Sequence, residues 1–314
     1  MREPSRLALI AGFAAVYLIW GSTYLGIFFA IQSIPPFLMA GARFLSAGII
    51  MYVSARVSGA PPPTSVTWRS AFIIGGCLLL CGNGGVTISE KWVPTGLASV
   101  LVATVPIDMA LLGWITGLAP RPTPLVWLGL IGGFVGVGLL LGPALTGFSA
   151  TSHLALGMSI LLIGSLVWSA GSLYSLKAKS SPSLFLAAGQ QMICGGGLLL
   201  LLGALLGEGQ QFNLQKLSTV SFGAFIYLVL VGALIGYTAY FWLLRHCEPA
   251  KVATYAYVNP VVAVILGMLF HGETLTTRTI VAGGLIVGSV AIVITAQRLT
   301  MKNTLPAPEF TIAD

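Results

Sequence analysis

The stretch "PFLMAGARFLSAGIIMYV", residues 36–53, has the composition of a membrane-spanning helix with a charge in its interior. Its apolar run is interrupted by Arg43. On insertion scales, a guanidinium near mid-membrane costs about 2.5–3.5 kcal/mol. Such a charge is retained where it faces the protein interior or a water-filled cavity, so Arg43 indicates a polar feature inside the protein.

The composition around this stretch is that of an all-α integral membrane protein. The chain has 314 residues, of which 56% are hydrophobic and only 7% are charged, whereas soluble domains average about 25% charged residues. The apolar residues form long runs, which is typical of membrane-spanning helices. The net charge of +7 therefore reports the sidedness of the loops and gives no indication of nucleic-acid binding.

Apolar segments separated by turn-forming residues predict ten membrane-spanning helices. The first has a basic start like a signal peptide but no small-x-small cleavage site, so we expect it to remain as an uncleaved span. The polar residues 299–314 are expected to form a disordered cytoplasmic tail. The ten segments are 7–30, 36–54, 69–89, 95–117, 123–142, 154–177, 183–206, 221–244, 250–270 and 277–297.

The basic residues predict which side of the membrane each loop occupies. With the N-terminus inside, the cytoplasmic segments hold eleven of them: Arg2, Arg6, Arg56, Arg69, Arg121, Lys177, Lys179, Arg245, Lys251, Arg298 and Lys302. The outer loops then hold three: Lys91, Lys216 and Arg278. The positive-inside rule accordingly predicts that both termini are cytoplasmic.

Residues 7–142 and 154–297 resemble each other as two copies of a five-helix unit. "YLIWGSTYLG" and "GARFLSAGII" in the first copy have counterparts "SLVWSAGSLYSL" and "GQQMICGGGLLLL" in the second. Each copy then has a proline-containing helix, "PTGLASVLVATVPIDMALLGW" or "PAKVATYAYVNPVVAVILGML", and a glycine-rich last helix. Because five is odd, the copies must enter the membrane in opposite directions, which is typical of secondary transporters with a site near mid-bilayer.

These motifs, together with "WGST", "ARF" and "HGETLT", resemble the EamA family of the drug/metabolite transporter superfamily, over about residues 10–297. The resemblance implies a ten-helix exporter of small metabolites, often amino acids. The sequence departs from the family pattern at two places. The first-half counterpart of Gly272–Glu273 is "GLAPRP", which has no acid, and Asp108 stands where the family pattern is apolar.

Helical rise places polar and aromatic residues at two depths between the copies. An outer cluster forms around Arg43, which is expected to fork onto a substrate carboxylate in a wet cavity; the alternative is a structural arginine that snorkels or binds carbonyls. In the inner cluster Gln191 is the counterpart of Arg43. Trp20 and Trp168 are expected to stack on substrate, although such rings also favour membrane interfaces. The predicted substrate-binding residues are Trp20, Thr23, Tyr24, Arg43, Asn83, Trp168, Gln191, Tyr237, Tyr255 and Asn259.

Asp108 is the predicted proton-coupling residue, because an intramembrane carboxylate marks function by default; the alternative is a neutral or paired acid held by tyrosines. Pro106 and Pro260 are the predicted hinges. Charged residues at the outer helix ends are expected to be solvated: Glu90, Lys91, Glu208, Lys216, Glu273 and Arg278.

We therefore predict a secondary carrier that works by alternating access on a small-molecule substrate in a bacterial inner membrane. The resemblance to the EamA family implies that it is an exporter. The small-residue spacings of the glycine-rich helices would also permit a homodimer. The alternatives are an organic-cation efflux carrier, a membrane enzyme acting on lipid or metabolite, and a channel. The sequence has no H-E-x-x-H, G-x-S-x-G or Walker motif, which disfavours an enzyme or an ATP-driven pump. No cofactor or metal is expected; Cys77 and Cys81 lie on one helix face without a third ligand.

Overall fold

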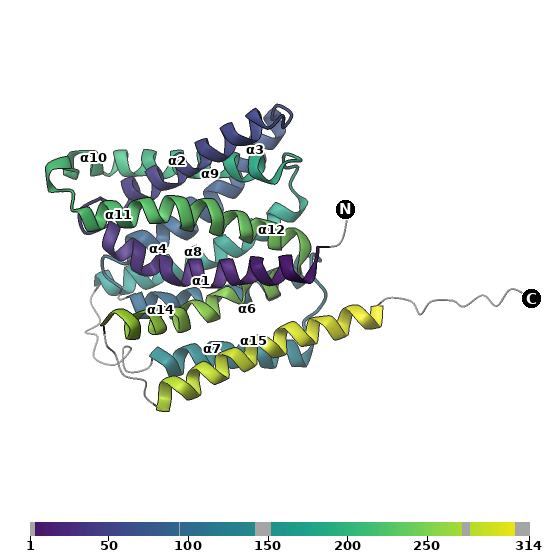
Figure 1. Cartoon of the computed structure of the whole chain (residues 1–314). Helices are drawn as coiled ribbons and strands as arrows, with labels where there is room; N and C mark the ends of the chain where they lie inside the picture. The colour runs from purple at the N-terminus through teal and green to yellow at the C-terminus, as the bar shows by residue number, and fades with distance from the viewer. Residues whose placement is uncertain (1–3, 94, 142–151, 272–276, 305–314) are drawn as a thin grey trace, which may run out of the picture.

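The computed structural model describes residues 4–93, 95–141, 152–271 and 277–304, and these residues form an all-helical bundle (Figure 1). Seven helical stretches are long and apolar enough to cross a membrane, and two further apolar helices, Pro124–Leu139 and Ile280–Ala296, are shorter. The seven are Arg6–Ala30, Pro36–Val57, Ser65–Ser89, Leu97–Ile115, His153–Lys177, Leu184–Leu205 and Thr219–His246. The protein is thus an all-α membrane protein, and the count of ten spans stays a prediction.

The helices follow the ten apolar segments of the sequence. Those of the first half are α1 (Arg6–Ala30), α2 (Pro36–Val57), α3 (Ser65–Gly75), η1 (Gly76–Asn83), α4 (Gly84–Ser89), α5 (Thr95–Val102), α6 (Val105–Ile115) and α7 (Pro124–Leu141). Those of the second half are α8 (Ser152–Lys177), α9 (Leu184–Leu205), α10 (Glu208–Gln211), η3 (Leu214–Lys216), α11 (Thr219–Tyr227), η4 (Leu228–Tyr237), α12 (Thr238–His246), α13 (Pro249–Ala253), α14 (Tyr255–His271) and α15 (Thr277–Thr304).

The polar residues in the turns begin the helices. The Ser5 hydroxyl accepts a hydrogen bond from the Ala8 N–H (3.2 Å) at the start of α1, and the Ser218 hydroxyl accepts one from Ser221 (3.1 Å) at the start of α11. Each bond satisfies an N–H group that the helix itself leaves unpaired. The predicted disordered tail begins with helix, because α15 continues to Thr304; residues 305–314 lie outside the described part of the chain.

Two long helices contain a π-helical stretch, one in each half of the chain. The first is η1, which continues α3 and leads into α4, and the second is η4, between α11 and α12. A π-helical turn holds one more residue than an α-helical turn, so it rotates the side chains that follow, and such stretches are common at functional sites. The third long helix of the first half (α3, η1 and α4) and that of the second half (α11, η4 and α12) thus carry the same irregularity.

The second helices of the two halves, α2 and α9, pack antiparallel with their backbones in close approach. A Cβ atom built at Gly196 of α9 would lie 2.5 Å from the Leu45 nitrogen and 3.0 Å from the Gly41 oxygen, and one at Gly48 would lie 3.0 Å from the Gly189 oxygen. Only glycine permits this contact. The pairing is reciprocal between the halves, as expected if the two copies are inserted in opposite directions.

The last helices of the halves, α7 and α15, lie side by side at the edge of the bundle (Figure 1). The glycines of α7 serve this contact: a Cβ at Gly136 would lie 2.8 Å from Ile286. On α15, a Cβ atom built at Gly283, Gly284 or Gly288 would meet no atom of another element within 4 Å. The start of α1 and the end of α15 lie at one end of the bundle, and α10 lies at the opposite end (Figure 1). A homodimer stays a prediction.

Candidate functional site

A cavity lies between the two halves of the chain and takes its walls from both. Its empty volume, open solvent included, is about 690 Å³. Residues of α1, α2, η1 and the α5–α6 helix contribute one side, and residues of α8, η4 and α14 contribute the other. Nine of the ten predicted substrate-binding residues line it: Trp20, Thr23, Tyr24, Arg43, Asn83, Trp168, Tyr237, Tyr255 and Asn259.

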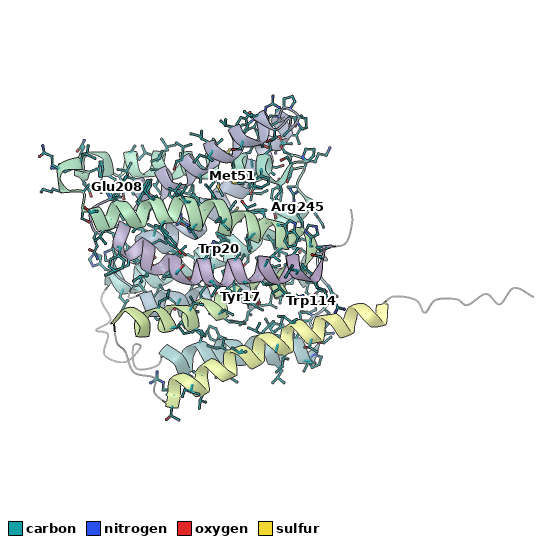
Figure 2. The ribbon with its side chains drawn as sticks, viewed as in Figure 1. Tyr17, Trp20, Met51, Trp114, Glu208 and Arg245 are labelled. Atoms are coloured by element: carbon teal, nitrogen blue, oxygen red, sulfur yellow. The ribbon has the colours of Figure 1, made fainter. Side chains whose placement is uncertain are left out.

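Aromatic rings from four helices meet at the centre of the molecule, where Figure 2 labels Trp20 on α1. The Trp20 ring lies 5.6 Å from the Trp168 ring and 4.8 Å from the Tyr255 ring, both edge-on, and 4.9 Å from the Tyr240 ring. The Trp168 indole N–H donates to the Tyr240 hydroxyl (3.1 Å), which also hydrogen-bonds the Ser172 hydroxyl (2.7 Å). The rings are thereby fixed as a rigid apolar wall.

These contacts correct the predicted division into an outer and an inner cluster. Trp20 belongs to the predicted outer cluster and Trp168 to the inner one, yet their rings touch. The two clusters are one site. Counting helical rise along separate helices gives only an approximate depth, because it takes no account of helix tilt or of the extra residues in η1 and η4.

Arg43 of α2 is almost fully buried, with 2% of its surface exposed, and its guanidinium reaches the cavity. Its Nε donates to the Leu228 carbonyl (3.1 Å), and its guanidinium carbon, Cζ, lies 4.6 Å from the centre of the Phe44 ring. Its Nη1 has no hydrogen-bond partner. The arginine is therefore anchored at one nitrogen, as the structural alternative requires, and free at another, as the binding interpretation requires.

Two asparagines present free amide oxygens to the same cavity. The Oδ1 atoms of Asn83 and Asn259 are buried and have no hydrogen-bond partner in the described chain. Tyr24 of α1 lies beside Asn259 and interacts with its side chain. Buried polar atoms are almost always paired in folded proteins, so a group of unpaired ones requires an explanation such as a ligand or water.

Gln191 does not line the cavity. It is 2% exposed, and its Oε1 accepts a hydrogen bond from the Tyr237 hydroxyl (3.2 Å). Because Tyr237 does line the cavity, Gln191 lies behind the wall and positions the tyrosine. The alignment of the two copies matched Gln191 with Arg43 in sequence but gave no information about the length or direction of either side chain.

Asp108 also lies away from the cavity. Its carboxylate accepts a hydrogen bond from the Thr104 hydroxyl (3.2 Å), one helical turn earlier, and the residue is half-buried. Pro106 lies in the first turn of α6, directly after the break that separates α5 from α6. Pro260 lies inside α14, whereas the break in that helix precedes Tyr255, so the two prolines occupy different positions relative to the breaks.

The sequence did not single out two residues near the site. Phe44 lies under the Arg43 guanidinium, and Glu90 presents two unpaired carboxylate oxygens within electrostatic range of Tyr24. Tyr240, which the sequence placed near the inner cluster with Tyr237, accepts the hydrogen bond of Trp168. The expectation that Glu90 and Glu208 are solvated is wrong. Glu208 is 5% exposed and accepts hydrogen bonds from the N–H groups of Phe37 (3.3 Å) and Leu38 (2.8 Å) at the start of α2.

The described residues contain no group of three or more histidine, cysteine, aspartate or glutamate side chains placed to hold a metal ion. The chemistry that the site offers is therefore binding. One cationic donor and two neutral amide acceptors face a space walled by aromatic rings.

A helical membrane bundle with a largely apolar cavity that holds a few polar groups between its halves is typical of integral membrane transport proteins. The chain belongs to the EamA-like transporter family, whose model matches residues 7–142 and 155–295. Membership of this family, and the names of its relatives, identify the chain as a transporter and not an enzyme.

Two similar proteins have names that agree with this assignment, and one solved structure shares the fold alone. "Uncharacterized inner membrane transporter YedA" of Escherichia coli (strain K12) is 37% identical over 311 residues, which is 98% of this chain and 97% of that protein. "Probable amino-acid metabolite efflux pump" of Salmonella typhimurium is 28% identical over 314 residues, which is 93% of this chain and 94% of that protein. A protein of known crystal structure has the same fold, with a TM-score of 0.73 at 19% identity, covering 94% of this chain and 99% of the other.

Proposed function

We propose that the protein is a secondary transporter that exports small zwitterionic metabolites such as amino acids, by alternating access to the cavity. One observation carries the proposal. In the described chain, the buried side-chain nitrogen and oxygen atoms without a hydrogen-bond partner are Arg43 Nη1, Asn83 Oδ1, Asn259 Oδ1 and both carboxylate oxygens of Glu90. The arginine and the two asparagines line the cavity, and Glu90 lies within electrostatic range of Tyr24, which also lines it. A ligand with both an anionic acceptor and a cationic donor would pair with them.

Arg43 is the proposed partner of the substrate carboxylate. A guanidinium binds a carboxylate through two parallel N–H···O bonds, and such charge-assisted bonds are about twice as strong as neutral ones. The Nε bond to Leu228 and the Phe44 ring hold the guanidinium in place before the ligand arrives. Such preorganisation reduces the entropy lost on binding.

The aromatic rings and the asparagines are the proposed partners of the remainder of the substrate. Asn83 and Asn259 offer carbonyl oxygens to an ammonium group. The wall of Trp20, Trp168 and Tyr255 offers flat apolar surface to a side chain. The mixture of a few fixed polar groups and a largely apolar lining is the ordinary composition of a small-molecule site.

Alternating access is supported by the arrangement of the two halves. In the proposed topology, ten spans form two inverted five-helix copies, with both termini in the cytoplasm of a bacterium and the chain in its inner membrane. One copy rocks against the other around the cavity. Helix breaks before Val105 and Tyr255, with Pro106 and Pro260 as the proposed hinges, give the walls places to bend. The relative named as an efflux pump supports the outward direction.

The sequence proposes Asp108 as the proton-coupling residue, although Asp108 does not line the cavity. Its only described hydrogen bond is the one from Thr104 of its own helix turn. Asp108→Asn with transport followed against external pH tests it. An unchanged pH dependence removes Asp108 from coupling.

Counterflow in liposomes tests the carrier. Purified protein is reconstituted in vesicles loaded with one unlabelled amino acid, and uptake of the labelled form is followed, with the matching amine and the matching keto acid as competitors. We expect saturable counterflow, in which either analogue competes less well than the amino acid because it lacks one of the two charged groups. Flux that rises linearly with concentration, without counterflow, would indicate a pore.

An organic-cation carrier is the second candidate, favoured by the excess of free acceptors and by the aromatic wall. The same competition series separates the two. If the amine competes as well as the amino acid and Arg43→Gln leaves this competition unchanged, the substrate is a cation. If Arg43→Gln abolishes the advantage of the amino acid over the amine, the substrate is a zwitterion.

A further inference from the structure

Glu90 extends the cavity-lining face of α4 toward the end of the bundle opposite the termini. Asn83 and Val86 line the cavity, and Glu90 follows them by one more helical turn, with its N–H bonded to the Val86 carbonyl (3.1 Å). Residues three and four apart share one helix face. Helical rise places Glu90 about 10 Å beyond Asn83 along the axis. Its side chain therefore lies on the same face just beyond the lining residues, and we take this place as the mouth of the cavity.

The carboxylate of Glu90 is buried without a partner. Neither oxygen has a hydrogen bond in the described chain, although other atoms of the residue are partly exposed. Burial raises the pKa of the Glu90 carboxyl well above its usual range, because desolvation penalises the charged form. Burial thus favours the protonated form of Glu90 more than water does for an exposed glutamate.

The groups around Glu90 do not supply a counter-charge. The Tyr24 hydroxyl of α1 is near enough to interact with the carboxylate electrostatically, but it carries no positive charge. The next residue, Lys91, is exposed. Three helices contact α4, namely α2, α8 and η1. Their titratable residues are Arg43, Tyr52 and Arg56 on α2, His153, Tyr174 and Lys177 on α8, and Cys77 and Cys81 on η1.

We propose that Glu90 is a proton-binding site that closes the mouth of the cavity when it is protonated. In the closed arrangement the carboxyl takes a proton from water at that end, forming an O–H bond. When the end opens, water solvates the carboxylate and the proton returns to the solvent. The pH on that side thus sets the balance between closed and open cavity. The inference rests on the alternating access proposed above.

Glu208 provides a matched control at the same end of the bundle. It is also a buried acid, and Figure 2 labels it at the end away from the termini. Unlike Glu90, it has two backbone N–H groups to accept from, those of Phe37 and Leu38. It therefore has a structural role in capping α2, and it is not a cavity-lining residue.

Cysteine labelling tests the proposal without any substrate. In a full-length variant whose four cysteines are replaced by alanine, Val86→Cys reports access to the cavity mouth, and Leu214→Cys, at a side chain 72% exposed, reports intrinsic reagent reactivity. The ratio of the two labelling rates is measured from about pH 5.5 to pH 8.5. We expect the ratio to rise about threefold or more with pH, since each pH unit changes the protonated-to-ionised ratio tenfold. With Glu90→Gln it should stay at the low-pH value, and with Glu208→Gln it should rise as in the parent.

A flat ratio in the parent, or an equal rise with Glu90→Gln, overturns the proposal. Glu90→Ala provides a second side chain that cannot titrate, in case the glutamine variant does not purify as a monodisperse protein, and it must also give a flat ratio. The outcome is separate from the fate of the carrier proposal. Absence of counterflow for every substrate removes the carrier, whereas the labelling ratio decides Glu90 alone.

Discussion

The free nitrogen of Arg43 distinguishes a binding arginine from a structural one. A purely structural guanidinium in the membrane would have its donors satisfied by carbonyls, as Nε is by Leu228. Nη1 remains unpaired although the residue is buried. Leaving a buried charged donor unpaired costs more than the net worth of the bond itself. The unpaired nitrogen supports the proposal that Arg43 binds an anionic group of the substrate.

Arg43→Lys tests this interpretation. Lysine keeps the positive charge but cannot form the two parallel bonds, and it would also lose the contact to Leu228. We expect the affinity for an amino acid to fall about tenfold or more, since a charge-assisted bond contributes roughly 1.5–3 kcal/mol. Binding of the corresponding amine should change little. Titration calorimetry on the purified protein gives both affinities.

Arg69→Lys is the control for Arg43→Lys, because Arg69 is exposed at the start of the third span and is not a cavity residue. It should leave both affinities unchanged. Equal losses for amino acid and amine in Arg43→Lys would mean that the substitution disturbs the cavity as a whole, and the assignment of the carboxylate to Arg43 would then be wrong.

Glu90 should make stability depend on pH in a defined direction. Because its pKa is raised in the folded protein, the folded chain keeps a proton that the unfolded chain loses above about pH 4.3. Glu90 therefore destabilises the protein increasingly as the pH rises from there toward its folded pKa. Glu90→Gln removes this cost, so the variant should melt at a higher temperature than the wild type, by a margin that is near zero at about pH 4.5 and widens as the pH rises.

Thermal denaturation in detergent across a pH series measures that margin. Glu208→Gln, a buried acid held by two N–H groups, controls for the general effect of removing a negative charge at this end. A margin for Glu90→Gln that stays constant or narrows with rising pH would show that the carboxyl is not buried as described.

At the scale of single helices, sequence predicted which residues are polar in the membrane better than it predicted where they point. Nine of the ten predicted binding residues line the cavity, because a polar or aromatic group at depth has few other places to go. Gln191 was misplaced because aligned positions in two copies share a depth and not a side-chain direction. Glu90 was missed because a helix end was assumed to be solvated. The π-helical turns in η1 and η4 have no signature in the sequence, and they rotate the faces that follow.

The close contact between α2 and α9 predicts opposite effects for two neighbouring glycines. At Gly196 an added methyl group would lie 2.5 Å from the Leu45 nitrogen, whereas at Gly197 it would meet nothing within 4 Å. Gly196→Ala should therefore destabilise the protein by roughly 1–3 kcal/mol through overpacking. Gly197→Ala should be neutral or stabilising by up to about 1 kcal/mol, because alanine is the better helix former.

Melting temperatures of the two purified alanine variants check this prediction. Since both substitutions add the same methyl group to adjacent positions of one helix, the difference between them reports the interhelical contact alone. Equal melting temperatures would mean that α2 and α9 do not approach as closely as described, and the reciprocal pairing of the two halves would lose its main support.

At the scale of the whole molecule, the cavity exists because two halves of similar order meet face to face. Each half supplies a tryptophan from its first helix, Trp20 or Trp168, and a π-helical stretch from its third. Neither half encloses the space alone. The sequence predicted two similar halves from the repeated order of its motifs. The number of spans cannot be read from helix length alone, because α7 and α15 yield shorter apolar stretches than the seven long ones.

The sidedness of the bundle follows from its charges and gives the last prediction. The loop with exposed Leu214 lies at the end opposite the termini, and exposed Ser58 follows α2 at the end with the termini. The positive-inside rule places the termini, and with them Ser58, in the cytoplasm. In spheroplasts of cells that express the cysteine-free chain, a membrane-impermeant thiol reagent should label Leu214→Cys and leave Ser58→Cys unlabelled until the membrane is permeabilised. The parent without cysteines must stay unlabelled throughout. The reverse pattern would mean that the protein has the opposite orientation in the membrane. The end of the cavity next to Glu90 would then face the cytoplasm, and its proton would come from the cell interior. Labelling of both positions in intact spheroplasts would mean that the two ends of the bundle do not lie on opposite sides of the membrane, which no carrier with a cavity between its halves allows.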